Sequence, residues 1–186
     1  MNKIRENPSA YKGVQPALKV RQLVEPEVRP QQKRIAKNAR PNAKIANYLR
    51  VYKADPYTLV KWVKLGVEAS TIRELADSMG MPKDKLYITL GLPRASVQRK
   101  ASQDKRLSPD ASSRVLGMKR LIGQVQSIVE ESGNLKGFDA AAWVATWLDQ
   151  EAEVLGGQKP SKFMDTPEGQ LLVSQLIART QSGAYS

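Results

Sequence analysis

Residues 94–102 read RASVQRKAS and hold the side chains of this chain best suited to bind a nucleic acid. A helix over this segment turns Ala95, Val97 and Ala101 toward a core and leaves its basic and polar residues outward. Arginine and glutamine can bond base edges in the major groove, whereas serine and lysine reach phosphates. The candidate DNA-binding residues, two of which follow the segment, are Arg94, Ser96, Gln98, Arg99, Lys100, Lys105 and Arg106.

The positive charge continues beyond this segment. Residues 94–120 hold eight lysines and arginines against two aspartates, a net charge of +6, with Arg114, Lys119 and Arg120 at the far end. These side chains could also be the solvated face of an ordinary helical bundle, because charged residues are common on exposed helices. The local charge favours DNA binding, and no metal-ligand spacing or aromatic RNA motif accompanies it.

Composition excludes several kinds of catalytic chemistry. The chain has no cysteine and no histidine, so serine-histidine and cysteine-histidine catalysis and thiolate or imidazole metal ligands are excluded. Aspartate and glutamate are scattered without a DxD pair, and no glycine-rich phosphate loop occurs. Carboxylate metal sites or a glutamate-based hydrolase are the enzymatic alternatives that this leaves. We therefore expect no enzyme, no bound metal and no cofactor.

The chain contains no obvious targeting or membrane segment. Its apolar runs are a few residues long, far short of the roughly 20 needed to cross a bilayer, and its start lacks an apolar signal region. A cytoplasmic protein is the expectation. With 186 residues, 41% of them hydrophobic, there is room for one domain or two small ones.

Most of the net charge of +12 lies in the first part of the chain. Residues 1–53 carry 13 lysines and arginines against three glutamates, a net charge of +10, and contain five prolines. Proline interrupts long helices and sheet interiors, so we expect an extended or partly disordered arm with a short helix at about residues 42–52. The arm is either a solvated tail or a segment that lies along phosphates and releases counterions.

Turn signals divide the chain after Asp55 into short helical segments. Few segments show the alternation of apolar and polar residues that is typical of strands, so the predicted class is all-α. The helices before RASVQRKAS are expected over residues 58–65, 70–79 and 83–90. Their predicted buried positions are Leu59, Val60 and Val63 in the first, Ile72, Leu75, Ala76 and Met79 in the second, and Leu86, Tyr87 and Leu90 in the third. Ser70 is the expected cap of the second helix, and Gly80 and Gly91 end the second and third. Short helices joined by glycine-bearing turns are typical of a helix-turn-helix.

Capping residues and apolar spacing also predict the helices of the C-terminal half. Ser108 is expected to cap a long helix over residues 109–132 with a broad apolar face. An aromatic stripe with Trp143 and Trp147 is either core or a dimer seam. Thr166 caps a last helix whose predicted buried positions are Leu172, Val173, Leu176, Ile177 and Thr180, and Gly183 ends it. The last residues then form either a directed peg with a free carboxylate or a frayed terminus.

Three motifs resemble a known family. They are AAAWVATWL, LGGQKPSKFMDTPEGQLLVSQLIARTQSGAYS and, more weakly, GLPRASVQRK with RLSPDASSRVLGMKRLI. Together they make residues 60–186 similar to the Xre antitoxins of RES-Xre toxin-antitoxin modules, relatives of the ParS and MbcA antitoxins. The arm is longer than expected for that family. In the long helix, where relatives often have an arginine, this chain reads RVLGMKR, and its Gly117 would loosen the helix by up to about 1 kcal/mol relative to alanine.

The resemblance implies an N-terminal helix-turn-helix domain and a C-terminal domain that binds the toxin and dimerises. The corresponding divisions are residues 1–53 for the arm, 54–134 for the helix-turn-helix domain and 135–186 for the toxin-binding domain. It implies a RES-domain toxin that consumes NAD or transfers its ADP-ribose, blocked by the C-terminal end of the antitoxin, and repression of the operon through operator DNA. The implied toxin-neutralising residues are Gly183, Ala184, Tyr185 and Ser186, with the Ser186 carboxylate facing cationic groups that otherwise hold NAD phosphates.

A second function stays open at this point. The basic arm and the RASVQRKAS segment would also suit a stand-alone DNA-binding transcriptional regulator or a nucleoid-type protein without a toxin partner. A RES-domain reading frame beside the gene would favour the antitoxin.

Overall fold

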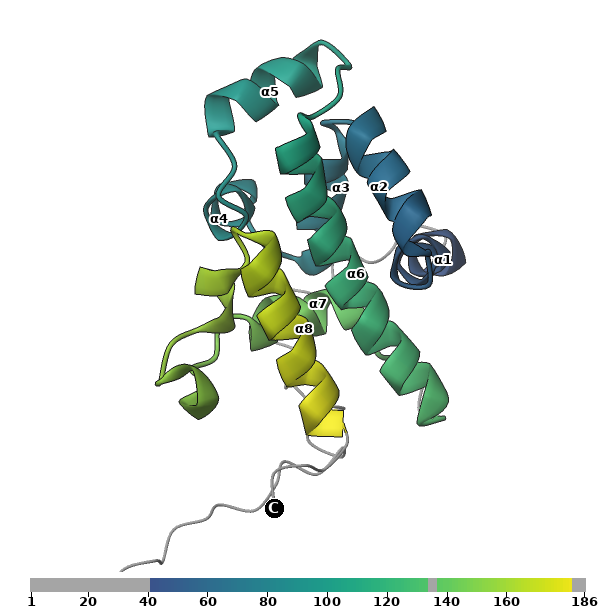
Figure 1. The fold of residues 1–186 in the computed structure, drawn as a ribbon, viewed down its shortest axis with the longest axis vertical. Coiled ribbons are helices and arrows are strands. Elements are labelled where there is room, and N and C mark those ends of the chain that lie inside the picture. Colours follow the sequence, from purple (N-terminus) through teal and green to yellow (C-terminus); the bar gives the residue numbers. More distant parts are fainter. Residues whose placement is uncertain (1–40, 134–136, 182–186) are drawn as a thin grey trace, which may run out of the picture.

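The computed structural model describes residues 41–133 and 137–181. Within these ranges the chain is helical and contains no strand, only two isolated bridges, so the predicted all-α class is confirmed (Figure 1). The helices are α1 (Pro41–Tyr52), α2 (Pro56–Leu65), α3 (Thr71–Met79), α4 (Lys83–Thr89), α5 (Arg94–Ser102), α6 (Pro109–Glu131), α7 (Ala140–Trp147), η4 (Glu153–Leu155), η5 (Pro160–Phe163) and α8 (Pro167–Gln181), of which η4 and η5 are 3₁₀-helices. No helix in the described part of the chain is both long enough and apolar enough to cross a bilayer.

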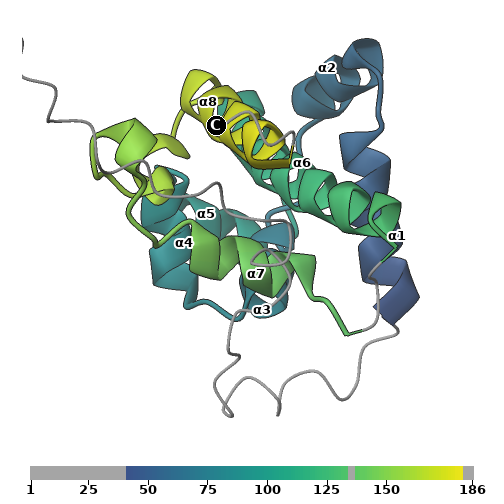
Figure 2. The same ribbon diagram turned by 90° about the horizontal axis from the view of Figure 1, so that it is seen from below.

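Helix α6 runs through the middle of the molecule. It begins at Pro109, and the Ser108 hydroxyl accepts a hydrogen bond from the Ala111 N–H at 3.3 Å, as the sequence predicts. Helices α1 and α2 lie on one side of α6 and α8 lies on the other, an arrangement that holds in both views (Figures 1 and 2). Because neighbours cover α6 from several directions, it buries polar residues such as Gln124 and Ser127 together with its apolar face.

Two glycines of α6 let other segments approach its backbone. A Cβ at Gly123 would lie 2.3 Å from the Tyr48 carbonyl oxygen and 2.7 Å from the Tyr52 Cβ, so α1 crosses α6 where no side chain separates them. A Cβ at Gly117 would lie 1.6 Å from Oε1 of Gln170 on α8. The sequence suggests only that Gly117 loosens the helix, whereas in the fold the missing side chain makes room for Gln170.

Helix α1 belongs to the helical body. It is the short helix expected at about residues 42–52, and its Tyr48 and Val51 are buried. Burial also raises the pKa of the Tyr48 hydroxyl, and a hydrogen bond with Ser78 opposes that shift. Residues 41–52, which the sequence places in the basic arm, are therefore folded onto α6, and residues 1–40 of the arm lie outside the described residues.

Two helix starts differ from the prediction. Ser70 does not cap α3, because its backbone is already helical (φ −59°, ψ −28°) and its side chain makes no capping hydrogen bond. Helix α2 starts two residues earlier than expected, since Asp55 is its cap and accepts a hydrogen bond from the Thr58 N–H at 3.0 Å. Extended backbone at the cap position aims a side chain at the free N–H groups, and Asp55 has it whereas Ser70 does not.

The buried faces of two helices also differ from the prediction. Helix α2 has no buried residue, and Val60, expected in its core stripe, is 51% exposed. On α8 the buried apolar side chains are Val173, Leu176 and Ile177, whereas Leu172 is 38% exposed, and the side chain of Thr180 lies outside the described set. Periodicity identified both helices, but neighbours in the fold decide which residues are covered.

The aromatic stripe of α7 is largely core. Trp143 and Leu148 are buried, and the half-buried Trp147 stacks on Trp143 with ring centroids 5.9 Å apart. Phe138 lies 6.5 Å from Trp143 and completes the group. Trp143 therefore holds α7 within the fold, and only part of Trp147 reaches solvent.

The close approach of α1 to α6 generates a stability prediction. Replacing glycine by alanine inside a helix normally stabilises it by up to about 1 kcal/mol. We expect Gly123→Ala to destabilise the chain by roughly 1–3 kcal/mol instead, because its methyl group would overlap the α1 backbone. Urea unfolding followed by circular dichroism measures the change. Ser113→Ala on the same helix is the control and should stay within about 0.5 kcal/mol of the parent; a stabilised Gly123→Ala variant would contradict the packing.

Candidate functional site

Helix α5 is anchored to the body by few residues. The chain enters it through Gly91 (φ 57°) and the buried Leu92, whose N–H donates to the Tyr87 carbonyl at 2.8 Å. Val97 is the buried residue of α5 itself, and Ala95, which the sequence turns toward the core, is exposed. Helix α5 therefore lies at one end of the molecule with most of its surface open (Figure 1).

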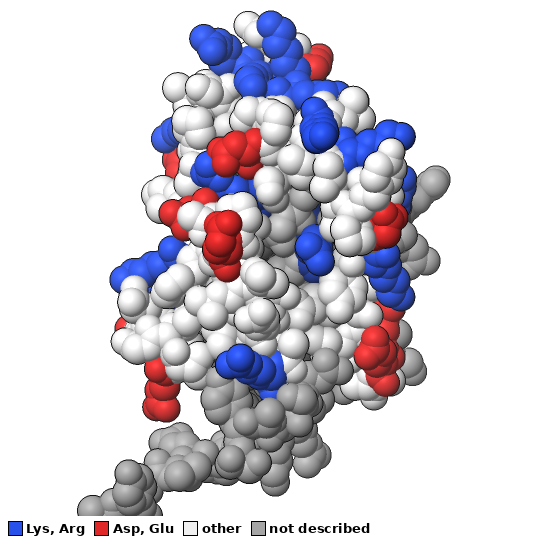
Figure 3. All heavy atoms as spheres, in the orientation of Figure 1, with Lys and Arg blue, Asp and Glu red and all other residues white. Residues whose placement is uncertain are grey.

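The structure brings the predicted DNA-binding residues together at this end. They lie on α5 and on the loop from α5 to α6, and lysine and arginine gather there in Figure 3. The exposed members are Arg94, Gln98, Arg99, Lys105 and Arg106, and the half-buried ones are Ser96 and Lys100. We call these seven residues the α5 surface. Their chemistry suits a polyanion, because several cations and hydrogen-bonding groups face solvent on one short helix and its loop.

Two cations of the α5 surface also have partners inside the chain. Arg106 donates from Nη1 to the Gly66 carbonyl at 3.0 Å, which ties the loop to the end of α2. Arg94 forms an exposed ion pair with Asp84 at 3.2 Å. An exposed pair of this kind contributes little to stability, so a phosphate could replace the carboxylate of Asp84.

Arg114 does not belong to the exposed basic surface that the sequence suggests. Its side chain is 18% exposed, its Nη1 donates to the carbonyls of Leu90 and Gly91 at 3.1 and 2.6 Å, and its Nη2 is paired with Asp110. Its Nε is buried without a hydrogen-bond partner among the described residues. Arg114 therefore holds the end of α4, and with it the turn that aims α5.

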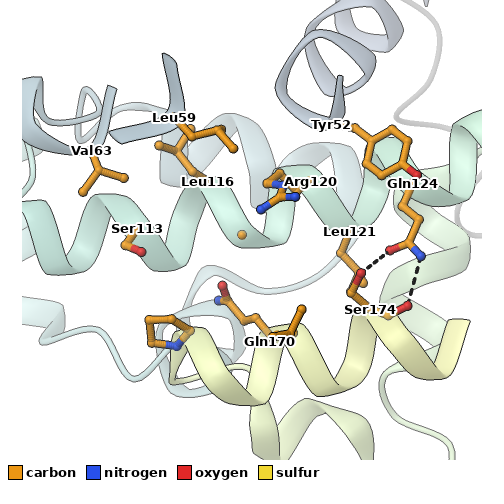
Figure 4. A pocket seen from close by; sticks show the side chains of 13 residues that line it. Tyr52, Leu59, Val63, Ser113, Leu116, Arg120, Leu121, Gln124, Gln170 and Ser174 are labelled. Atoms are coloured by element: carbon orange, nitrogen blue, oxygen red, sulfur yellow. Dashed lines mark hydrogen bonds between the residues drawn. The ribbon is translucent and has the colours of Figure 1, made fainter. Parts of the chain in front are cut away.

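Lys119 and Arg120, the two other cations at the end of the basic stretch, also lie outside the α5 surface. Lys119 is half-buried, and burial lowers the pKa of its ammonium group while Glu74 opposes the shift. Arg120 is exposed on α6, where it lies between residues of α2 and residues of α8 (Figure 4). Residues 94–120 are thus one basic stretch in sequence and several separate environments in space.

Helices α3 and α4 are joined by a tight turn through a glycine. The turn passes through Gly80 in the left-handed region (φ 62°), and the Met81 N–H donates to the Ala76 carbonyl at 3.1 Å. Helix α4 also meets the C-terminal part of the chain, since Lys85 is paired with Asp149 and the helix contacts η5. Helix α5, the next helix along the chain, has no comparable neighbour on its outer side among the described residues.

The C-terminal helix ends far from α5. Thr166 caps α8 as predicted, since its hydroxyl accepts from the Gly169 N–H at 3.1 Å. In Figure 1 α8 runs away from α5, so that its C-terminal end lies at the opposite end of the molecule. The predicted toxin-neutralising residues Gly183, Ala184, Tyr185 and Ser186 lie outside the described residues. Helix α5 and the C-terminal end of α8 therefore lie at opposite ends of the described body.

A third surface was not predicted from the sequence. A groove of about 180 Å³ lies on α6 between α2 and α8, with Tyr52 of α1 at one end (Figure 4). Its residues are Tyr52, Leu59, Val63, Ser113, Leu116, Gly117, Arg120, Leu121, Gln124, Pro167, Gln170, Leu171 and Ser174. One signal was present in the sequence: α2 has apolar residues on most of its faces, which is more than one buried stripe needs.

Comparison with known proteins gives two matching family models and two curated relatives. Residues 63–118 match the antitoxin Xre-like helix-turn-helix domain, and residues 137–183 match the antitoxin Xre/MbcA/ParS C-terminal toxin-binding domain. The chain is 39% identical over 139 residues to the Prs ADP-ribosylating antitoxin of Sphingobium sp. (strain YBL2), covering 75% of this chain and 87% of that protein. It is 27% identical over 156 residues to Antitoxin Xre of Yersinia enterocolitica serotype O:8 / biotype 1B (strain NCTC 13174 / 8081), covering 74% of this chain and all of that protein.

The α5 surface generates a binding prediction. Replacing Arg99 and Lys105 together by alanine should weaken DNA binding and reduce the slope of log affinity against log salt by about one for each phosphate that is no longer neutralised. Titration of labelled duplex DNA at several salt concentrations measures both quantities. The control replaces Lys159 and Lys162, two exposed lysines in and before η5, and removes the same charge away from α5. Equal losses of affinity in both variants would show that net charge matters and the α5 surface does not.

Proposed function

This chain belongs to the Xre/MbcA/ParS antitoxins, and we propose that it neutralises a cognate RES-domain toxin and represses its own operon. The matched helix-turn-helix and toxin-binding domains support the two activities. The observation that carries the proposal is that α5 and the end of α8 lie at opposite ends of one body (Figure 1). A chain arranged in this way can hold DNA and a toxin at the same time.

Neutralisation is proposed to use residues 183–186 as a plug in the active site of the toxin. The support is the anchoring of α8: Val173, Leu176 and Ile177 are buried, and Gln124 and Ser174 join α8 to α6 by two hydrogen bonds. A helix fixed to α6 by these contacts gives the segment that follows it a defined point of attachment. The Ser186 carboxylate would then face cationic groups that bind NAD phosphates in the free toxin.

The toxin is proposed to be the partner that consumes NAD or transfers its ADP-ribose. The name of the Sphingobium relative contains the term ADP-ribosylating, which we assign to the toxin of such a pair. The present chain has no histidine or cysteine for acid-base or nucleophilic work. Its proposed role is therefore occlusion of an active site by binding, with no chemistry of its own.

Repression is proposed to use a dimer, or a larger assembly with toxin, in which two copies of α5 contact two half-sites of the operator. One α5 is nine residues long and offers few side chains that can reach base edges. Helix-turn-helix proteins commonly pair to bind half-sites about one helical turn apart, and a pair of basic arms would add phosphate contacts.

A stand-alone DNA-binding regulator is the second candidate, favoured by the net charge of +10 in residues 1–53. Under this alternative, replacement of Arg94, Arg99 and Lys100 abolishes all function and no toxin is bound. A RES-domain reading frame next to the gene, and a complex of the two products with a mass that includes both, would decide for the antitoxin.

Deletion of Ala184–Ser186 tests the plug. We expect the truncated chain to bind the toxin and to retain operator DNA, while NAD consumption by the toxin returns toward its uninhibited rate. The reason is that occlusion is lost while the anchored surface of α8 is kept. Following NAD in a purified complex of the adjacent RES-domain protein with either chain measures the effect, and full inhibition by the truncated chain would contradict the plug.

A further inference from the structure

The groove between α2 and α8 is lined by apolar side chains from three helices. Helix α6 forms its floor with Leu116 and Leu121, α2 contributes Leu59 and Val63, and α8 contributes Leu171 (Figure 4). Gln124 and Ser174 close one end through hydrogen bonds of 2.7 and 3.0 Å. The space of about 180 Å³ is large enough to receive side chains of another chain.

The helices beside the groove also leave apolar surface in water. Leu171 is 61% exposed at the edge of α8, and α2 has no buried residue. A ten-residue helix gains little stability by itself, so α2 depends on tertiary packing, yet the packing present covers it only in part. Contiguous exposed apolar surface of this kind is typical of binding sites for another protein.

Arg120 gives the groove a charge. Its guanidinium lies between the α2 side and the α8 side in Figure 4, and within the described residues it makes no hydrogen bond or ion pair. The other groove residues are apolar or uncharged polar. A segment that fills the groove with apolar side chains and brings a carboxylate to Arg120 would be complementary to both features.

We propose that the groove binds a helix of the toxin, with apolar side chains toward Leu116, Leu121 and Leu171 and a carboxylate toward Arg120. This rests on the proposed function, since it requires a toxin partner. The choice of the toxin as occupant follows from continuity: Pro167, Gln170, Leu171 and Ser174 are groove residues and lie on α8, within the matched toxin-binding domain. Amphipathic helices commonly bind apolar grooves in this way.

The position of the groove separates affinity from inhibition. Helix α8 has 15 residues and rises about 1.5 Å for each, so its end lies roughly 20 Å from the Pro167 end of the groove. One interface of ordinary size, about 800 Å² on each partner, can include both regions. The groove then supplies much of the binding energy, and the segment after α8 supplies the block of the active site.

Charge and size substitutions at the groove test the inference with the full-length chain. Leu171→Glu and Arg120→Glu change exposed side chains and should each lower affinity for the adjacent RES-domain protein by about tenfold or more, whereas Arg120→Lys should lose less. Isothermal titration measures affinity, and thermal unfolding verifies that each variant is folded. Matched controls are Ile88→Glu on α4 and Arg73→Glu on α3, both exposed and outside the groove, and both should bind as the parent does.

A label gives an independent readout. The chain has no cysteine, so Leu171→Cys can carry a single environment-sensitive fluorophore, with Arg73→Cys as the control position. Toxin binding should shift the emission at position 171 and leave that at position 73 unchanged. A shift at neither position, with binding intact, would overturn the inference.

The outcomes separate this inference from the proposed function. If Leu171→Glu and Arg120→Glu bind the toxin as the parent does and still inhibit it, the groove is not its site, although the function stands. If the parent chain does not bind the toxin, both fail. Leu171→Glu could instead dissociate a homodimer of the toxin-free chain and leave toxin affinity unchanged. In that case the groove is an interface between two copies of this chain, and the inference is wrong.

Discussion

The close packing of other helices against α6 is the constraint on which the rest of the structure depends. Gly123 brings the α1 backbone next to α6, and Gly117 makes room for Gln170 of α8. Gln170 in turn donates from Nε2 to the carbonyls of Arg114 and Met164 at 3.0 and 2.8 Å. Each of these two close contacts requires a glycine in α6. Together they pack α1 and α8 against the same helix.

A second set of contacts joins the DNA-binding and toxin-binding parts of this antitoxin. Lys85 of α4 is paired with Asp149 after α7, and Arg114 of α6 holds the carbonyls of Leu90 and Gly91. A Cβ at Gly91 would lie 3.0 Å both from the Arg114 guanidinium and from the Asp165 side chain just before α8. The turn that aims α5 is thus held between α6 and the C-terminal domain, so the orientation of α5 depends on both.

The distribution of buried surface has a functional meaning. The core is continuous from α3 and α4 through α6 to α7 and α8, whereas α2 stays partly uncovered beside the groove. Exposed apolar surface lowers solubility and adds nothing to the stability of the free chain. This exposed surface lies next to α8, and α8 lies within the matched toxin-binding domain, so its position is consistent with the proposed toxin site.

The sequence by itself determined the helical class and most helix positions. Caps at Ser108 and Thr166, the glycine after α3 and the 3.6-residue spacing of apolar residues are local signals, and local hydrogen bonds decide them. Only the tertiary structure decided which faces are covered. Arg114 turned inward and Val60 and Leu172 stayed in water, because burial depends on neighbours far away in the sequence. The groove is of the same kind: its residues come from α1, α2, α6 and α8, and no local pattern specifies that these helices leave a space between them.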